Sequence, residues 1–160
     1  MIALKPITPK EYSTIVQWNE GKNQEYLFQW AGFTLYEYPL TADQIAQRAE
    51  TEGVQIFIIY TSGQPVGAME LCDIDTVTKS GRICRVIFAE QAKNKGYGEL
   101  ALRQLIHMAF TEMGLVSLSL RVACFNVAAI RCYEKAGFRV KEYFQENNPH
   151  WNHYIMELKK

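Results

Sequence analysis

The sequence has no excess of either charge, and this limits the partners that it can attract. Lysine plus arginine and aspartate plus glutamate both number 17 in 160 residues. A protein without a basic excess has no overall field that draws it to nucleic acid or to an anionic membrane surface. We therefore expect neither nucleic acid nor a membrane as a partner, although a local basic patch is compatible with these totals.

Long apolar runs and paired cysteine motifs are absent as well. The opening residues MIALKPITPKEY lack the apolar stretch typical of a signal peptide, and no segment reaches the length of a membrane-spanning helix. The cysteines form no CxxC pair and have no histidine at zinc-finger spacing: Cys72, Cys84, Cys124 and Cys132. We expect reduced, mainly buried thiols, no bound metal and a cytoplasmic protein.

Internal repeats, low-complexity segments and flexible linkers are also missing, so residues 1–160 are expected to form a single domain. What the chain does contain is a mixture of strand-like and helix-like segments, which predicts a mixed α/β fold. The residues from 23 to 39 are rich in aromatic side chains and are expected to be irregular. Apolar periodicity predicts strands at residues 2–8, 54–60, 66–75, 82–88, 115–124, 138–145 and 150–159, and helices at 10–20, 41–53, 96–114 and 126–137.

A basic turn rich in glycine, KNKGYG at residues 93–98, precedes the longest predicted helix. Glycine at Gly96 and Gly98 lets the backbone turn its N–H groups toward an anion and lets that anion approach closely. The helix that follows adds the positive end of its dipole and its unpaired amides. The turn therefore predicts an anion site, with an ordinary loop carrying solvated lysines as the alternative.

Two familiar phosphate-binding motifs do not fit this turn. A P-loop needs Lys followed by Ser or Thr directly after its last glycine, whereas Tyr97 follows Gly96. Gly96, Gly98 and Ala101 do match the G-x-G-x-x-A fingerprint of dinucleotide-binding folds. That fingerprint follows its strand at once, whereas seven residues intervene here, and the next predicted strand carries Arg121 but no acid. Both interpretations are rejected.

The turn is instead similar to the coenzyme A loop of the GNAT acetyltransferase superfamily, Gln/Arg-x-x-Gly-x-Gly/Ala. Farther along, ACFNVAAIRCYEKAGFRV at residues 123–140 resembles that family's block in which an Asn after a strand opens a helix ending in Tyr-Glu-Lys-x-Gly-Phe. The two blocks stand in the family's order, joined by one predicted helix and one predicted strand. The resemblance covers residues 54–158 and is nearest to the branch containing ribosomal-protein N-terminal acetyltransferases and spermidine acetyltransferases.

This resemblance implies a GNAT fold, whose mostly antiparallel sheet has a splayed parallel strand pair at the cofactor site. It implies an N-acetyltransferase that moves an acetyl group directly from acetyl-CoA to a primary amine of a protein N-terminus, a polyamine or another small molecule. A non-catalytic acyl-CoA-binding module with the same fold is the alternative. A homodimer is left open.

The resemblance also assigns cofactor contacts to particular residues. Main-chain groups along the pantetheine arm would come from Val86, Ile87 and Phe88. Asn126 would contact the cofactor, cap its helix, or do both. The pyrophosphate would rest on the turn formed by Lys93, Asn94, Lys95, Gly96, Tyr97 and Gly98. Lys93 stands where the family has Gln or Arg. A lysine supplies charge at this position but cannot make bidentate contacts.

Two residues are the candidates for catalysis. Tyr133 matches the family's general acid: a phenol with a pKa of about 10 is protonated at neutral pH and can donate to the departing thiolate. A packing tyrosine is the alternative. Glu70 is the candidate general base, chosen over Asp73 and Asp75, with a solvated strand-edge charge as the alternative for each. The amide of Phe88 would stabilise the oxyanion.

Overall fold

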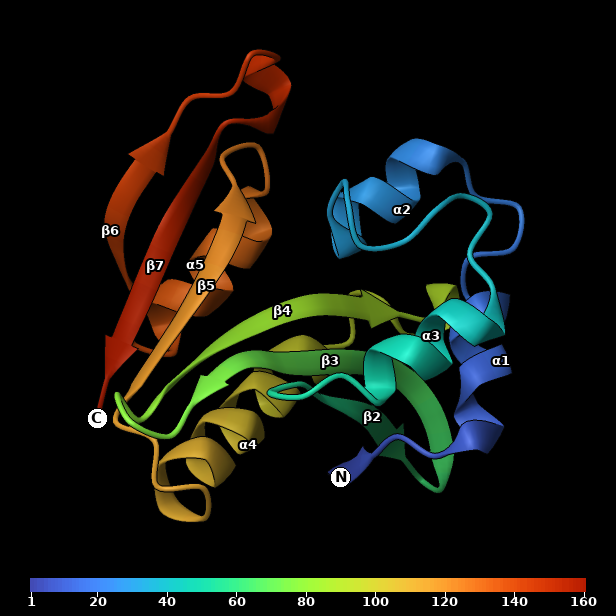
Figure 1. Cartoon of the computed structure of the whole chain (residues 1–160), viewed down its shortest axis with the longest axis horizontal. Helices are drawn as coiled ribbons and strands as arrows, with labels where there is room; N and C mark the ends of the chain where they lie inside the picture. The colour runs from blue at the N-terminus through green and yellow to red at the C-terminus, as the bar shows by residue number, and fades with distance from the viewer. The chain divides into compact units, whose positions relative to one another are not determined.

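Seven strands form where the sequence has its apolar runs, and they pair in the order β1-β2-β3-β4-β5-β7-β6 (Figure 1). The pairs β1–β2, β2–β3, β5–β7 and β6–β7 are antiparallel, and β4–β5 is parallel. The predicted mixed α/β class with one parallel strand pair is thereby confirmed. The strand bounds are β1 (Ile2–Pro6), β2 (Gln55–Thr61), β3 (Gln64–Asp75), β4 (Ser80–Phe88), β5 (Ser117–Ala123), β6 (Arg139–Phe144) and β7 (His153–Lys159).

The computed structural model describes every residue from Met1 to Lys160. It divides into two units that interleave along the chain, Met1–Cys72 with Cys84–Tyr97 and Asp73–Ile83 with Gly98–Lys160. A single domain over the whole chain therefore stays a prediction. No helix combines the length and the apolar character that crossing a membrane requires. The helices are η1 (Pro9–Glu11), α1 (Tyr12–Gln17), α2 (Gln24–Ala31), α3 (Ala42–Ala49), η2 (Glu90–Ala92), α4 (Tyr97–Thr111), α5 (Val127–Lys135) and η3 (Pro149–Trp151).

In the first unit, helices cover a core that lies against the sheet. Strands β2 and β3 are joined by a tight turn at Ser62 and Gly63, both of which have a positive φ. Helices α1 and α3 pack against each other (Figure 1). The buried core residues come from helices, loops and strands alike: Ile15, Leu27, Ala31, Tyr36, Leu40, Ile45, Ile58, Ala68 and Ile87.

Helix α2 corrects one prediction, because residues 23–39 were expected to be irregular throughout. The Asn23 side chain caps this helix by accepting a hydrogen bond from the Tyr26 amide at 2.9 Å. Leu27 and Ala31, four residues apart, are its buried face, and Gly32 follows its end with φ at 86°. The cap and the apolar spacing were present in the sequence, but the many aromatic residues obscured them.

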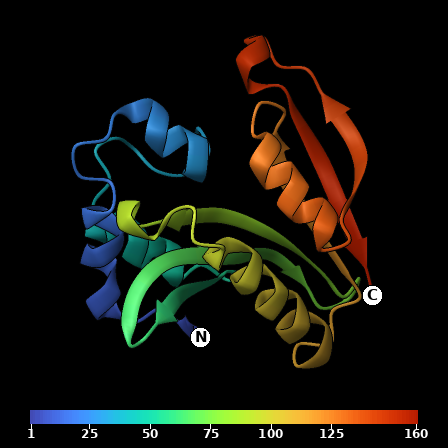
Figure 2. The same cartoon turned by 180° about the vertical axis from the view of Figure 1, so that it is seen from behind.

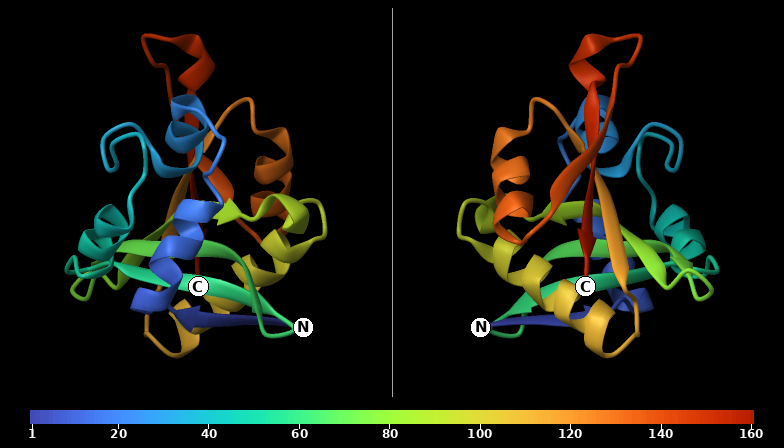
Figure 3. Two further views of the ribbon diagram at one scale, coloured as in Figure 1. Left: turned by 90° about the vertical axis from the view of Figure 1, so that its right-hand side faces the viewer. Right: turned by 90° about the vertical axis from the view of Figure 1, so that its left-hand side faces the viewer.

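The second unit is built on β5, β7 and β6. The start of β4 pairs with β5 in parallel from Ser80↔Ser117 to Ile83↔Leu120. Figure 2 shows α5 lying against one face of the three strands β5, β7 and β6. In Figure 3 the β6–β7 hairpin is seen edge-on, with η3 at its end. The strands predicted at residues 138–145 and 150–159 form this antiparallel hairpin.

Candidate functional site

The second half of β4 is shaped by one unusual backbone conformation. Arg85 has φ at 52°, a left-handed conformation that few residues other than glycine adopt inside a strand. The parallel pairing of β4 with β5 covers only Ser80 to Ile83, so residues 86–88 lie beyond it. At the strand end, the Ala89 amide donates to the carbonyl of Val66 in β3 at 2.9 Å. Residues 86–88, whose main chain is predicted to contact the pantetheine arm, therefore come directly after a local turn in β4 at Arg85.

Gly67 in β3 allows Phe88 to lie where it does. A Cβ atom at Gly67 would stand 2.6 Å from Cδ1 of Phe88 and 2.7 Å from the carbonyl oxygen of Ile87. Real Cβ atoms do not make contacts this short, so any larger residue would displace the end of β4. Gly67 was not singled out from the sequence, although an isolated glycine inside a predicted strand often marks the close approach of another backbone.

The turn before α4 has the backbone geometry of an anion site. Asn94 has φ at 60° and Gly96 has φ at 80°, and α4 begins at Tyr97. Left-handed residues in a turn aim consecutive amides toward one side, and the first amides of a helix have no partner within it. Asn is among the few non-glycine residues that tolerate this conformation. The predicted pyrophosphate turn thus has the required local shape, while the contacts themselves stay a prediction.

Lys93 belongs to a cluster that sequence reasoning did not anticipate. Its Nζ donates to Oε2 of Glu90 at 2.9 Å and to the phenol oxygen of Tyr26 at 3.2 Å. Lys22 donates to the same Glu90 oxygen at 3.0 Å. The two ammonium groups stand 5.0 and 5.1 Å from the centre of the Tyr26 ring. Hydrogen bonds from Lys93 and Lys22 lower the pKa of Glu90. Two cations therefore share one carboxylate directly before the turn.

In the second unit, Asn126 and Tyr133 lie at the two ends of α5. The Asn126 side chain accepts a hydrogen bond from the Ala129 amide at 3.3 Å, so its role as a helix cap is observed. The Tyr133 ring packs edge-on against Phe138, with 6.1 Å between the ring centres. Burial raises the pKa of Tyr133 to about 12. The phenol is therefore protonated at neutral pH, as a proton donor must be.

Glu70 does not have the surroundings of a general base. Its side chain is 2% exposed, and its Oε1 accepts from Nε of Arg48 at 3.0 Å and from Nη1 of Arg85 at 3.1 Å. Nη2 of Arg48 donates to the same oxygen at 2.5 Å. A proton taken up by this carboxylate would leave two largely buried guanidinium groups without their anion, which is costly. The general-base hypothesis therefore lacks structural support, and we call this group the Arg48–Glu70–Arg85 cluster.

The same cluster argues against a metal site at this place. Ligand atoms of Glu70, Cys72 and Cys84 lie within 4.8 Å of one another. A hydrogen bond with Cys72 and burial raise the pKa of the Cys84 thiol. A cation would also have to compete with two guanidinium groups for the Glu70 oxygen. These residues therefore do not fit a metal ion.

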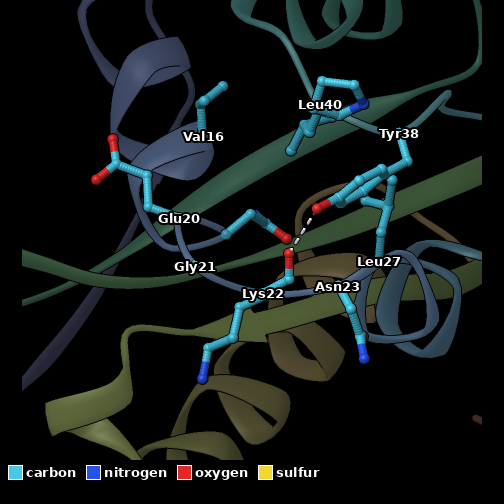
Figure 4. A pocket seen from close by; sticks show the side chains of 10 residues that line it. Val16, Glu20, Gly21, Lys22, Asn23, Leu27, Tyr38 and Leu40 are labelled. Atoms are coloured by element: carbon cyan, nitrogen blue, oxygen red, sulfur yellow. Dashed lines mark hydrogen bonds between the residues drawn. The ribbon is translucent and has the colours of Figure 1, made fainter.

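A hollow of about 220 Å³ lies beside the start of α2 (Figure 4). Its apolar lining includes Val16, Leu27 and Leu40. Tyr38 from the aromatic stretch closes one side by donating to the carbonyl of Lys22 at 3.0 Å, the dashed line in Figure 4. The carboxylate of Glu20 points away from the other labelled side chains. The hollow therefore offers a mainly apolar surface, with Glu20 and Lys22 as the charged residues of its lining.

The predicted site residues are divided between the two units. The first unit holds residues 86–88 and the turn up to Tyr97, together with Glu70. The second unit holds Gly98, Asn126 and Tyr133.

A sequence model described as the acetyltransferase (GNAT) family matches residues 15–138 of the chain. A curated relative, spermidine N(1)-acetyltransferase from Vibrio cholerae, is 29% identical over 73 residues, which are 46% of this chain and 42% of that protein. The aligned segment thus spans less than half the length of that relative.

Solved structures resemble the whole chain. Spermidine N-acetyltransferase from Vibrio cholerae in complex with CoA and spermine has a TM-score of 0.83 at 18% identity, covering 99% of this chain and 95% of that one. A dodecameric structure of spermidine N-acetyltransferase from the same organism, in an intermediate state, has a TM-score of 0.78 at 18% identity, covering 99% and 93%. At this identity the likeness establishes the fold, and the predicted fold is confirmed.

Proposed function

Because this chain belongs to the acetyltransferase (GNAT) family, we propose that it transfers the acetyl group of acetyl-CoA to a primary amine of a polyamine. The family match confirms the family and the enzyme class that the sequence predicted. The choice of a polyamine is supported by the names of the relatives, which act on spermidine or are bound to spermine.

The observation that carries the proposal is the turn that follows β4 and opens α4. Two left-handed residues, Asn94 and Gly96, stand directly before the first amides of a 15-residue helix. An anion at this place meets backbone N–H groups and the positive end of the helix dipole. The diphosphate of coenzyme A is an anion of this kind, and the turn lies inside the segment that matches the family.

In the proposed reaction, acetyl-CoA supplies the thioester, and the chain binds and orients it. The main chain of residues 86–88 pairs with the pantetheine arm, and the amide of Phe88 donates to the thioester carbonyl oxygen. The neutral amine forms a bond to the carbonyl carbon, and the carbon–sulfur bond breaks. Tyr133 gives its proton to the departing sulfur, the attacking amine loses a proton to solvent, and Tyr133 regains a proton from solvent. Lys93 and Lys22 add positive charge beside the diphosphate.

The acceptor side is proposed to lie along the aromatic stretch of the first unit. The apolar floor of the hollow, formed by Val16, Leu27 and Leu40, suits the methylene segments of a polyamine. An oligomer is proposed as well, because one of the similar structures is dodecameric. A homodimer and a cytoplasmic location stay predictions.

A panel of amines tests this function. Purified protein is incubated with acetyl-CoA and spermidine, spermine, free amino acids or a peptide with a free N-terminus, and acetylated products are identified by mass. We expect monoacetylated polyamine with the native chain and much less with Tyr133→Phe. Tight acetyl-CoA binding without any acetylated amine would favour the non-catalytic module instead.

A further inference from the structure

The Arg48–Glu70–Arg85 cluster joins three elements of the first unit at one buried carboxylate. Glu70 lies in β3, Arg48 in α3 and Arg85 in β4. The arginine side chains are 14% and 15% exposed, so the ion pairs are largely shielded from water. Buried pairs of this kind are poor sources of stability in comparison with apolar packing. Their presence here therefore needs an explanation other than stability.

Arg85 is held in place at a local cost. Its Nη1 contacts Oε1 of Glu70 and Sγ of Cys84, each at 3.1 Å. Its Nε, in contrast, is buried without any hydrogen-bond partner. A buried donor without a partner is unfavourable. The guanidinium therefore keeps its contact with Glu70 although one of its own donors, Nε, makes no hydrogen bond.

The backbone of Arg85 is also in an unfavourable conformation. Its φ of 52° lies in the left-handed region of backbone conformations, which is unfavourable for a residue with a Cβ atom. Such conformations persist where the surrounding contacts determine them, and they cluster at functional sites. Here the conformation occurs in β4 immediately before residues 86–88.

We propose that the Arg48–Glu70–Arg85 cluster holds the left-handed turn of β4 at Arg85 and thereby positions the main chain of residues 86–88 for acetyl-CoA. This inference rests on the proposed function, which assigns those residues to the pantetheine arm. Glu70 and Arg85 are then positioning residues that do not touch the reacting atoms. Glu70 keeps a function, but it is a different one from proton abstraction.

Replacements of Arg85 distinguish the effect of its side-chain contacts from the effect of its backbone conformation. Arg85→Ala removes the anchor and keeps a Cβ that disfavours a positive φ, whereas Arg85→Gly removes the anchor but adopts this conformation freely. We expect Arg85→Ala to raise the Kd for acetyl-CoA about tenfold, which corresponds to about 1.4 kcal/mol. Arg85→Gly should raise it less, and Arg85→Lys, which keeps a cation for Glu70, should stay within about threefold of the native chain.

The matched control is Arg82→Ala. Arg82 lies in the same strand and pairs with Asp73 at 2.8 Å, but its backbone does not have a positive φ. Calorimetry with acetyl-CoA alone should give this variant the native Kd. Circular dichroism of each variant shows whether it is folded. If Arg85→Ala does not fold, the comparison of Arg85→Gly with Arg85→Lys decides, because the inference requires Lys to bind more tightly than Gly.

Glu70→Gln distinguishes positioning from proton transfer. A positioning role predicts a higher Kd for acetyl-CoA with kcat reduced by less than about tenfold, whereas loss of a general base lowers kcat by about 100-fold or more at unchanged Kd. The inference is overturned by that second pattern, by Arg85→Gly that binds as tightly as the native chain, or by Arg85→Lys that binds no better than Arg85→Ala. If the native chain itself does not bind acetyl-CoA, the proposed function fails instead.

Discussion

Lys22 and Lys93, from segments far apart in the chain, donate to the same oxygen of Glu90 at 3.0 and 2.9 Å. Both ammonium groups also stand over the ring of Tyr26. This arrangement links the start of α2 to the turn proposed to hold the coenzyme A diphosphate. It also gives the unusual Lys93 a fixed position, which a lysine alone would not have.

Lys93→Ala is expected to weaken acetyl-CoA binding up to about fivefold at low salt, in line with a partly exposed charge contact. The difference from the native chain should shrink as salt is added, because the contact is screened. Calorimetry at two salt concentrations measures this. Lys10→Ala is a suitable control, because Lys10 is an exposed lysine in η1. A salt-independent loss would indicate a structural role for Lys93 instead.

Tyr133→Phe is expected to lower kcat by about 100-fold to 10,000-fold while the Kd for acetyl-CoA changes little, since only the proton donor is removed. Burial raises the pKa of this phenol to about 12. The protonated form thus persists through neutral pH and is lost only as the pH rises toward that value. The rate should therefore show no fall caused by Tyr133 below about pH 11. A fall near pH 9 that disappears in Tyr133→Phe would contradict this assignment.

Gly67→Ala is expected to lower stability by about 1–3 kcal/mol, because the added Cβ overlaps the Phe88 ring and the Ile87 carbonyl. The displaced strand end should also bind acetyl-CoA more weakly. Thermal unfolding and calorimetry measure the two effects. Adding Phe88→Leu should recover part of the stability, since it removes the aromatic ring but leaves the carbonyl contact. Native stability in Gly67→Ala would refute the steric argument.

Asn126→Ala is expected to cost about 0.5–2 kcal/mol of stability through loss of the α5 cap. Asn126→Asp keeps an oxygen for the Ala129 amide and should restore most of that loss in thermal unfolding. If Asn126 also contacts the cofactor through its amide nitrogen, Asn126→Asp will be stable but will bind acetyl-CoA poorly. A stable Asn126→Asp variant that binds acetyl-CoA with native affinity would show that Asn126 acts only as a helix cap.

The sequence predicted the fold well because the informative patterns are local. Strand and helix periodicity located all seven strands and four of the five α-helices, and two short blocks identified the family. The residue environments that the sequence did not reveal depend on partners distant in the chain. Glu70 looked like a free acid at a strand edge, because no residue near it in the sequence indicates that Arg48 of α3 contacts its carboxylate. Gly67 likewise acquires its meaning only when Phe88 is seen beside it.

The proposed acetyl transfer is tested most directly by the rate of coenzyme A release in the presence of spermidine, measured as the appearance of free thiol. We expect release that saturates with spermidine, yields acetylated spermidine in equal amount and falls at least about 100-fold in Tyr133→Phe. Release that is independent of any amine, or equal rates in the native chain and Tyr133→Phe, would contradict this proposal.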